Sequence, residues 1–523
     1  MTQDGRCTTV ETGSQTAEAG SPTAEAACQT TEAESQEDIP PARSAALNTV
    51  AETDARARSL ALNDSVPASG LFGEADRPLV EGSRASWRIA PEPFLITPQS
   101  HQRLQQLGDQ LLAFYGAANR LYKRSARGTI PAFFHEYLDI GKSETVVDYG
   151  RMNRFRHDLP GVIRPDLLLT ADGVKAAELD SIPGGIGLTG SMQQHYSNLG
   201  FTMVGGANGM VEGFAAMIQG RAANDDPQLA IAVSDESNDY RPEMQWVSDQ
   251  LCRLGMSSAC AKPEEIELHG GNLMLQDRKI DTLYRFLELF DLKNIPNYDV
   301  LLYAARKQLV TMTPPVKAYL EEKLLFALFH HPVLAEFWAQ EMGAKTVAAL
   351  KQVVPETWIL DPRPLPPQAV VPGLEIAKRP VTNWEQLKGL GQADRRLVIK
   401  PSGFAPTAWG SRGVTIGHDR PESEWDDAVQ TALEAFETTP HVLQKFHHGN
   451  RYGTRYYDFA QDSVRKMHGR VRLSPYYFVA DDKTTLAGIL VTIVPADKKL
   501  IHGMVDAVMM PAAISDSGVD LDL

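Results

Sequence analysis

Residues 164–187, RPDLLLTADGVKAAELDSIPGGIG, are the most informative stretch of the sequence, because they hold three carboxylates and an arginine that one β-hairpin would bring together. The ADG sequence at 171–173 is a turn signal between two apolar-rich runs. We predict a three-residue loop with a left-handed glycine, which aligns Asp166 with Glu178 and Arg164 with Asp180. Because side chains alternate between faces along a strand, these four side chains would share one face.

The two faces of this hairpin differ in chemistry. The second face would carry Leu167, Leu169, Ala177 and Leu179, which suit a hydrophobic core. On the first face, like charges directly opposite each other are unfavourable by themselves. A hard cation reverses that penalty, and clustered carboxylate oxygens suit Mg²⁺. The hairpin therefore indicates a magnesium site.

Two other interpretations of the hairpin stay open. Acidic hairpins also occur on solvated faces that bind nothing. A two-residue loop of Asp172 and Gly173 would shift the register by one, place Asp166 opposite Leu179 and disperse the cluster. The PGG run at 183–185 favours a functional hairpin, because it supplies a pliable loop directly after the carboxylates.

Length and composition bound the class of protein. The chain has 523 residues and is 43% hydrophobic, enough for a large core or several lobes. A net charge of −15 argues against a general nucleic-acid binder. No stretch approaches the length of a membrane span, no apolar segment follows Met1, and the four cysteines show no disulfide or metal pattern. We therefore expect a cytoplasmic protein without nucleic-acid or membrane partners.

Three regions of different character follow one another along the chain. Residues 1–80 are acidic and rich in Ala, Glu, Thr and Ser without an apolar period, so we predict a disordered tail. Residues 85–310 hold the hairpin and then a buried strand at 229–233 (LAIAV), a loop and a helix, typical of an α/β lobe. Residues 311–523 contain further strands and a glycine-rich loop, and we expect them to form a second lobe.

The glycine-rich loop follows a lysine. A short predicted strand, LVIK at 397–400, ends at Lys400 and leads into PSGFAPTAWGSRGVTIG, with four glycines. Such a lysine reaches phosphate oxygens, while glycine amides approach them unhindered. Neither a Walker A motif nor a dinucleotide fingerprint is present, so a purely structural loop explains this segment equally well.

Two later strands carry weaker signals. The segment HVLQKF at 441–446 mixes apolar and polar side chains and could present backbone groups to an adenine edge, or be an ordinary sheet strand. Arg470 and Arg472 alternate onto one face of the next strand, where they would balance phosphate charge or form a solvated basic face.

Taken together, these segments resemble glutathionylspermidine synthetase and its relatives, the circularly permuted ATP-grasp ligases. The hairpin matches the family's R-x-D motif at Arg164 and Asp166, and has E-x-D at Glu178 and Asp180 where the family has E-x-N. Three further segments resemble the family's lysine strand with its phosphate loop, its adenine hinge and the passage before its nucleotide lobe: VIKPSGF at 398–404, LQKF at 443–446 and IDTLYRFLELF at 280–290. The metal-ligand strands precede the lysine strand, as in permuted members.

The resemblance implies an α/β fold with α+β lobes, an ATP-grasp fold in permuted order whose mixed or antiparallel sheets surround a nucleotide cleft. It implies that Asp166, Glu178 and Asp180 hold two Mg²⁺ ions and that Arg164 is a catalytic residue facing the transferred phosphoryl group. Residues 311–523 would then be the nucleotide lobe.

The resemblance also implies an ATP site and a substrate loop. The residues that would bind ATP, with Lys323 as the second family lysine, are Lys323, Lys400, Ser402, Gly403, Gly410, Arg412, Gly413, Leu443, Gln444, Lys445 and Phe446. The loop beside the acyl acceptor would include Ser181, Gly184 and Gly185.

The implied activity is an ATP- and Mg²⁺-dependent carboxylate–amine ligase that forms an amide through an acyl phosphate, with a small carboxylate and a small amine as substrates. Asp180 in place of asparagine adds a negative charge at the metals, and the SIPGG sequence at 181–185 differs from the family's substrate loop, so specificity for glutathione and spermidine does not follow. Two other functions fit the same residues, an ATP-grasp small-molecule phosphotransferase and a non-catalytic nucleotide-binding scaffold.

Overall fold

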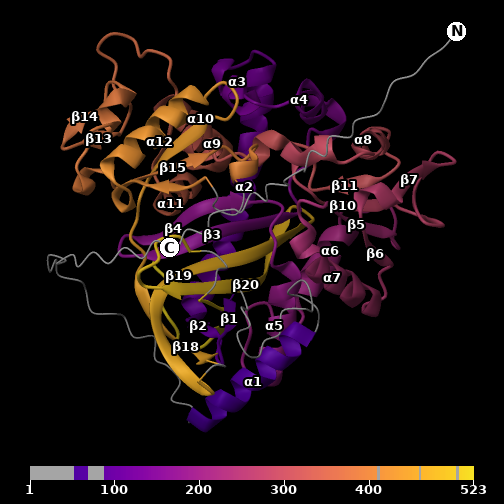
Figure 1. Ribbon diagram of the computed structural model, residues 1–523. Coiled ribbons are helices and arrows are strands. Elements are labelled where there is room, and N and C mark those ends of the chain that lie inside the picture. The colour runs from indigo at the N-terminus through magenta and orange to yellow at the C-terminus, as the bar shows by residue number, and fades with distance from the viewer. Residues whose placement is uncertain (1–51, 69–86, 409–412, 459–460, 502–505) are drawn as a thin grey trace, which may run out of the picture. The chain divides into compact units, whose positions relative to one another are not determined.

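The computed structural model describes residues 52–68, 87–408, 413–458, 461–501 and 506–523 (Figure 1). Contacts along the chain separate Met1–Pro41 from Ala42–Leu523, and every described residue lies in the second unit. The second unit is a mixed α/β structure with several sheets. A division into lobes at 310/311 stays a prediction, and most of the expected tail lies outside the described residues.

The largest sheet of the described chain has eight strands in the order β1-β21-β20-β19-β3-β4, with β18 paired to β19 and β2 paired to β21. Its strands are β1 (Trp87–Ile89), β2 (Phe94–Ile96), β3 (Val162–Thr170), β4 (Gly173–Asp180), β18 (Arg451–Asp458), β19 (Ser463–Ala480), β20 (Lys483–Pro495) and β21 (Ala507–Ile514). The long strands β19 and β20 are rich in β-branched and aromatic residues, which favour extended backbone.

The predicted hairpin forms from β3 and β4, and its pairing is the predicted one. Asp166 pairs with Glu178 and Arg164 pairs with Asp180. The expected three-residue loop is wrong, because Thr170 pairs with Gly173 and leaves a two-residue turn. A β-bulge between the pairs Asp166–Glu178 and Leu167–Ala176 restores the register by adding one extra residue, Ala177, to β4.

The bulge also changes which alanine faces the core. Leu167 and Leu169 are buried as expected, but they pair across the hairpin with Ala176 and Val174, which are also buried. Ala177, expected in the core, is only partly buried. The extra residue of a bulge reverses the alternation of side chains between the two faces of a strand. Ala176 therefore faces the core, while Glu178 lies on the same face as Asp166.

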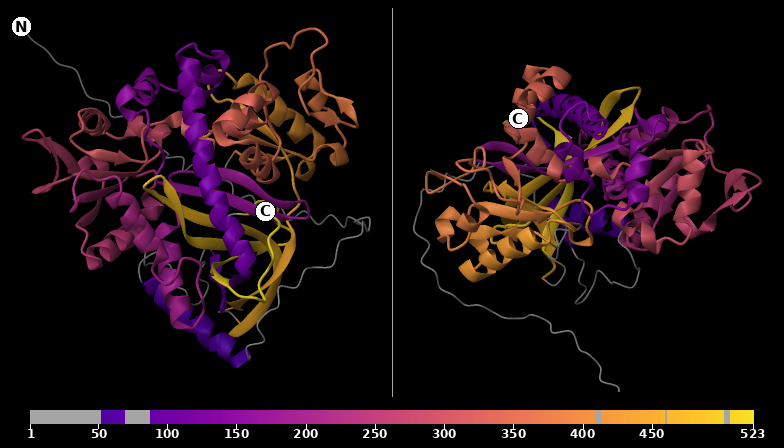
Figure 2. Two further views of the ribbon diagram at one scale, coloured as in Figure 1. Left: turned by 180° about the vertical axis from the view of Figure 1, so that it is seen from behind. Right: turned by 90° about the horizontal axis from the view of Figure 1, so that it is seen from above.

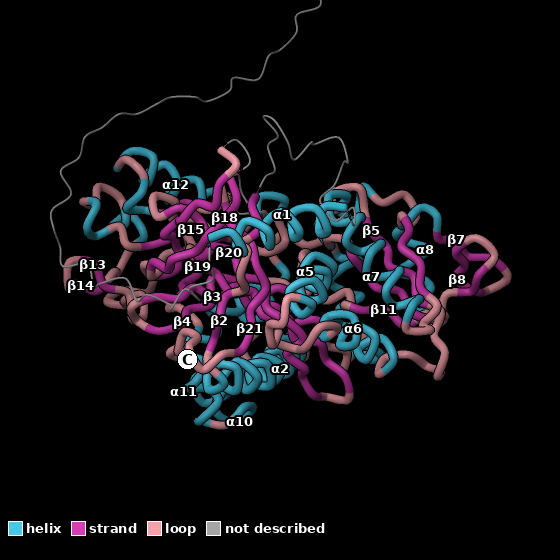
Figure 3. Tube along the Cα trace, turned by 90° about the horizontal axis from the view of Figure 1, so that it is seen from below, coloured by secondary structure: helices cyan, strands magenta, loops and turns pink. Residues whose placement is uncertain are grey.

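A parallel sheet follows in the order β11-β10-β5-β6, and its strand β5 confirms the predicted buried segment LAIAV. The other strands are β6 (Ser258–Ala261), β10 (Thr282–Phe286) and β11 (Thr311–Thr313), with β5 at Leu229–Val233. Helices α5 (Ile186–Asn198) and α6 (Gly209–Gln219) contact the large sheet, and α7 (Arg241–Arg253) contacts the parallel one (Figure 3). Phe214 of α6 contacts both sheets, with ring centroids 4.9 Å from Tyr284 and 5.8 Å from Phe478.

A third sheet is antiparallel, in the order β12-β17-β15-β16. Its strands are β12 (Thr357–Ile359), β15 (Leu397–Pro401), β16 (Thr415–Ile416) and β17 (His441–Lys445), which confirms the strands predicted at LVIK and HVLQKF. Two small sheets complete the strands: β7 (Ile266–His269), β8 (Asn272–Leu275) and β9 (Arg278–Lys279) in one, β13 (Glu375–Ile376) and β14 (Arg379–Pro380) in the other.

The longest helix, α2 (Pro98–Ala126), lies across the large sheet and contacts β20 and β3 (Figure 2). Thr97 caps it, because the Thr97 hydroxyl accepts a hydrogen bond from the Ser100 amide at 3.1 Å. The remaining helices of the described chain are α3 (Phe133–Asp139), α4 (Glu144–Arg151), α8 (Tyr298–Arg306), α9 (Leu324–His330), α10 (Ala335–Met342), α11 (Ala344–Val353) and α12 (Glu422–Glu434). None of the helices in the described ranges has the length and apolar character needed to cross a bilayer.

Helix α1 (Glu52–Ala68) corrects part of the predicted disordered tail. Its buried residues Ala55, Ser59 and Leu62 recur at i, i+4 and i+7 and form one narrow stripe. The helix contacts α5, β1, β18 and β19, so tertiary contacts stabilise it. The prediction failed here because two of the three buried positions hold alanine and serine, and a single leucine, Leu62, does not give the apolar period that marks a helix in a sequence.

We expect Ala55→Leu to destabilise the protein by about 1–3 kcal/mol, because Ala55 is 0% exposed and a larger side chain overpacks the contact. Ala57→Leu, at an exposed position of the same helix, should change the free energy of unfolding by less than about 0.5 kcal/mol. Urea titration of both variants measures this, and equal stabilities would show that α1 does not dock as described.

Candidate functional site

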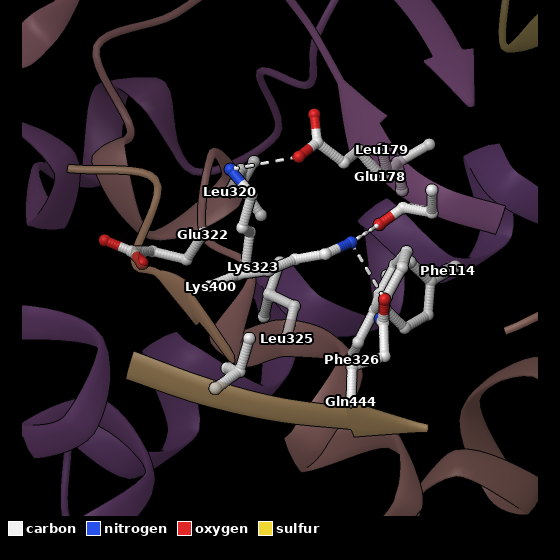
Figure 4. Close-up of a pocket in the computed structure, with 12 residues that line it drawn as sticks. Phe114, Glu178, Leu179, Leu320, Glu322, Lys323, Leu325, Phe326, Lys400 and Gln444 are labelled. Atoms are coloured by element: carbon white, nitrogen blue, oxygen red, sulfur yellow. Dashed lines mark hydrogen bonds and ion pairs between the residues drawn. The ribbon is translucent and has the colours of Figure 1, made fainter. Parts of the chain in front are cut away.

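A pocket lies where β4, β15, β17 and the start of α9 meet (Figure 4). Four candidate site residues from separate parts of the chain line it, namely Glu178, Lys323, Lys400 and Gln444. The rest of its lining is mainly apolar: Phe114, Ala177, Leu179, Leu320, Glu322, Leu325, Phe326 and Val442. The free volume of about 20 Å³ holds about one water molecule.

The strand register explains why Lys400 and Gln444 reach this pocket. Lys400 pairs with Val442 and Val398 pairs with Gln444, and directly paired residues share a face of the sheet. The alternate residues Leu397, Ile399 and Leu443 are buried on the other face, in a core that includes Trp425 of α12. Alternation along β15 and β17 thus separates the pocket face from the core face.

Lys400 is buried and held by two acceptors. Its Nζ donates to the Ala177 carbonyl at 2.8 Å and to Gln444 Oε1 at 2.9 Å, as the dashed lines of Figure 4 show. The first acceptor belongs to the bulge residue of β4. Burial lowers the pKa of Lys400 to about 8, although the nearby Glu178 carboxylate opposes the shift and Lys323 reinforces it. Because an ammonium has three donors, one remains for a further acceptor.

Lys323 supplies the second ammonium group of the pocket. Its Nζ lies 3.7 Å from Glu178 Oε1 and donates to the Ala408 carbonyl of the glycine-rich loop at 3.2 Å. The charged side chains that line this small, largely apolar space are two lysines and two carboxylates, Glu178 and Glu322. Because Lys142 neutralises Glu322 from outside the lining, the group as a whole has one positive charge in excess, which suits an anionic ligand.

Arg164 and Asp166 form a buried charge network next to the pocket. Asp166 accepts hydrogen bonds from Arg472 Nη1 at 3.0 Å and from Ser474 Oγ at 2.9 Å, and Arg164 Nε lies 3.2 Å from it. Burial by itself would raise the pKa of Asp166, but Arg164, Arg472 and the Ser474 hydroxyl outweigh it and hold the pKa below its ordinary value. Arg472, expected beside phosphates or solvent, instead neutralises this carboxylate.

Asp180 and Gly184 hold the other side of Arg164. The guanidinium lies 3.2 Å from Asp180 Oδ2 and donates to the Gly184 carbonyl at 3.3 Å. Burial raises the pKa of Asp180 above its ordinary value, against the opposing effect of Arg164 and of the Ile182 amide. Arg164 is thus held between two carboxylates, Asp166 and Asp180, at the start of the predicted substrate loop.

The three predicted metal ligands do not gather in one cluster. Within the residues that the structure describes, no group of three His, Cys, Asp or Glu side chains could hold a metal ion. Both Asp166 oxygens already accept hydrogen bonds, so this residue does not fit Mg²⁺ as it stands. The same holds for Asp180, because its Oδ1 accepts a hydrogen bond from the Ile182 amide at 2.9 Å and its Oδ2 accepts one from Arg164 at 3.2 Å. Glu178, whose side chain is 30% exposed and lies 3.7 Å from Lys323, is the predicted ligand whose oxygens fit Mg²⁺.

The described part of the glycine-rich loop is anchored through Ser402 and Gly403. Ser402 Oγ donates to the Glu322 carboxylate, which is also paired with Lys142, and both side chains of that pair are almost completely buried. A Cβ on Gly403 would lie 1.8 Å from the Glu321 carbonyl, so only glycine fits there. A Cβ on Gly413 would lie 2.7 Å from the Pro401 ring. Gly410 and Arg412 lie outside the described residues.

The four residues of the predicted adenine hinge separate into different environments. Leu443 is in the core of the third sheet and Gln444 lines the pocket. Lys445 is exposed and forms an ion pair with Glu356 at 2.8 Å. Phe446 contacts the His418 ring, with centroids 4.4 Å apart. The structure therefore places one of the four in the pocket itself.

The predicted substrate loop is held at the start of α5. Gly185 has φ of +90° and its amide donates to Glu243 Oε1 at 2.6 Å, while the Gly184 carbonyl accepts a hydrogen bond from Tyr476 Oη at 2.7 Å. Ser181 is buried beside them. Burial raises the pKa of Glu243 to about 7 despite the amides of Gly185 and Leu188.

Sequence reasoning missed four residues that build the site: Lys142, Glu243, Glu322 and Ser474. Glu243, Glu322 and Ser474 contact predicted residues that lie 58 to more than 300 positions away, as in Gly185–Glu243 and Asp166–Ser474, and Lys142 contacts Glu322. Glu322 had one available signal, because it directly precedes Lys323. The other three carry no local pattern that separates them from ordinary polar residues.

We expect Asp166→Asn to destabilise the protein by about 3–5 kcal/mol, because it leaves Arg164 and Arg472 buried without a full countercharge. Glu178→Gln, which removes a partly exposed carboxylate on the paired strand, should change stability by less than about 1 kcal/mol. Urea titration at neutral pH measures both. Equal effects would mean that the Asp166 network does not stabilise the hairpin.

Comparison with known proteins finds no matching family model and no matching curated protein. Among solved structures, a glutathione synthetase-like effector from Globodera pallida in its apo form matches with a TM-score of 0.52 and 13% identity, over 88% of this chain and 97% of that one. A protein provisionally named gamma-glutamylcysteine synthetase from Methylobacillus flagellatus matches with a TM-score of 0.36 and 12% identity, over 77% of this chain and 84% of that one. The chain thus has the fold of the glutathione synthetase-like effector.

Proposed function

We propose that the protein is an ATP- and Mg²⁺-dependent carboxylate–amine ligase of the circularly permuted ATP-grasp type. The observation that carries this proposal is the convergence of Lys323 and Lys400 with Glu178 and Gln444 in one pocket. These residues come from separate parts of the chain, and the sequence resemblance assigns them to ATP or its metal. The glutathione synthetase-like fold supports the same interpretation.

In the proposed site, the two lysines bind the phosphates of ATP. The third donor of Lys400 and the ammonium of Lys323 make charge-assisted hydrogen bonds to phosphate oxygens. Gln444 and Phe446 lie along the nucleoside. Because the free volume of the pocket holds about one water molecule, ATP enters only when the pocket widens. The described start of the glycine-rich loop, residues 403–408, contacts Lys323 through the Ala408 carbonyl and is the proposed moving part.

Two Mg²⁺ ions complete the proposal, and when bound they would neutralise charge on the phosphates. Glu178 is the ligand whose oxygens fit this role as they stand. Asp180 would have to exchange its hydrogen bonds from the Ile182 amide and Arg164 for a metal. Asp166, the third proposed ligand, would have to exchange those from Arg472 and Ser474. In the described arrangement Asp166 instead positions Arg164.

Arg164 is the proposed catalytic residue. Its guanidinium stays charged at every working pH, and Asp166 and Asp180 hold it beside the loop that starts at Ser181. A fixed positive charge at this place would stabilise the transferred phosphoryl group and the acyl phosphate. The amine would then approach along the loop that includes Gly184 and Gly185, displace phosphate and form the amide.

A second candidate function is a non-catalytic nucleotide-binding protein. The observation in its favour is that Asp166 is already neutralised by two arginines and a serine. A third, an ATP-grasp phosphotransferase, would use the same lysines but would not need an amine.

The test of function is ADP release from Mg·ATP in a screen of amino acids, short peptides and polyamines, with products identified by mass. We expect sustained release only when an acid and an amine are both present. Glu178→Gln should abolish it, whereas Glu385→Gln, at an exposed ion pair with Lys388, should not. Sustained release with an acid alone would indicate the phosphotransferase. ATP binding without turnover would indicate the non-catalytic protein.

ATP affinity should fall as pH rises above about 8, because the pKa of Lys400 is about 8 and the protonated form binds phosphate. Above that pH the affinity should drop about tenfold per unit, and binding at pH 8 should take up protons. Calorimetry in buffers of different ionisation enthalpy measures both effects. Lys400→Met should weaken binding and remove the pH dependence, whereas Lys279→Met on the exposed strand β9 should retain it. A dependence that survives Lys400→Met would exclude Lys400 as its origin.

A further inference from the structure

An aromatic cluster lies directly after β17. It consists of His418 in the short 3-10 helix Gly417–Asp419, together with Phe446 and His448. The ring centroids are 4.4 Å apart for His418 and Phe446, 5.4 Å for His418 and His448, and 4.9 Å for Phe446 and His448. We call these three residues the aromatic box. The proposed function assigns no role to His418 or His448.

His418 is buried without hydrogen bonds to either of its ring nitrogens from the described residues. Its exposed fraction is 9%. Burial lowers the pKa of His418 to about 4, and the nearby Lys499 and His448 reinforce the shift. The ring is therefore neutral at pH 7, with one donor and one acceptor. Buried donors and acceptors are normally satisfied, so these atoms call for an external partner.

The aromatic box lies on the pocket side of the third sheet. Val398 pairs with both Gln444 and Ile416, so these three residues share the face that carries Lys400. Phe446 is two residues beyond Gln444, about 7 Å along the chain direction, and its amide continues the ladder to the Arg396 carbonyl at 3.0 Å. Phe446 is thus one step along the same face from the lysine pocket, and the rings of His418 and His448 contact it.

We propose that the aromatic box is the nucleobase subsite of the nucleotide site and that His418 donates or accepts the hydrogen bond that reads the base edge. This inference rests on the proposed function. Phe446 offers a ring face for stacking, which every base accepts. His418 offers a directional contact to a ring nitrogen or an exocyclic group.

Metal binding and ordinary packing account for the aromatic box less well than a base does. A metal site is not supported, because no group of three potential ligands gathers within the described chain. Ordinary packing would place an apolar residue at 418, since burying a polar ring without hydrogen bonds costs stability. A base removes that cost by supplying the missing partner.

The test compares ATP with inorganic tripolyphosphate, which has the phosphates but no base, by calorimetry with Mg²⁺. His418→Phe keeps the ring and removes both nitrogens. It should weaken ATP binding by about tenfold and leave tripolyphosphate binding unchanged, as expected for one lost hydrogen bond to a buried partner. Phe446→Leu should also weaken ATP selectively, because it removes the stacking face. The ratios between the affinities for ATP, GTP and ITP should move closer to one in His418→Phe and should stay as in the wild type in Phe446→Leu.

His331→Phe is the matched control. His331 also has a buried ring nitrogen without a partner and packs on Phe133 and Phe134, but it does not line the pocket. It should bind ATP like the wild type. Thermal unfolding of His418→Phe should show an unchanged or higher midpoint, because the variant buries no unsatisfied nitrogen. If the midpoint falls instead, Phe446→Leu becomes the deciding variant.

The outcomes separate this inference from the proposed function. If the wild type binds ATP and tripolyphosphate but His418→Phe and Phe446→Leu bind ATP equally well, the box is packing and the inference is wrong while the nucleotide site stands. If both variants weaken tripolyphosphate as much as ATP, the box supports the phosphate pocket and not a base. If the wild type binds neither ligand, the proposed function and this inference both fail.

Discussion

The buried charge network of Asp166 holds the site together. It joins strands that are remote in sequence, because Arg472 and Ser474 of β19 hold the carboxylate from one side and Arg164 of β3 holds it from the other. A buried charge is tolerable only when it is paired and hydrogen-bonded, so these strands have one acceptable register. That register determines which face of the hairpin carries Glu178.

The bulge at Ala177 connects this network to the pocket. Its extra residue turns Glu178 to the side of Asp166, and its carbonyl accepts a hydrogen bond from Lys400. One backbone irregularity therefore orients a carboxylate and anchors the buried lysine of another sheet. Bulges commonly re-aim side chains next to active sites, and here the same device brings two sheets together at the pocket.

The charged side chains around the pocket are held firmly in place, and the pocket itself has little free volume. Lys142, Glu322 and Ser402 form a buried chain of contacts that ties the start of the glycine-rich loop to the segment before Lys323. The charges are thus preorganised, while the free volume of about 20 Å³ admits only about one water molecule. Preorganised charges of this kind stabilise a charged ligand without a reorganisation cost when it binds.

The local elements could be predicted from the sequence. The hairpin and the strands LAIAV, LVIK and HVLQKF were recognised from their apolar residues and flanking turn residues. These signals lie within a few positions of each other, so a short window of sequence contains them. The pairing of Asp166 with Glu178 was also predictable, although for a turn that the structure does not have. The bulge, the docking of α1 by small residues, and the partners Arg472 and Glu322 became visible only in the folded chain. These depend on contacts between distant segments, whose energies no short window of sequence contains.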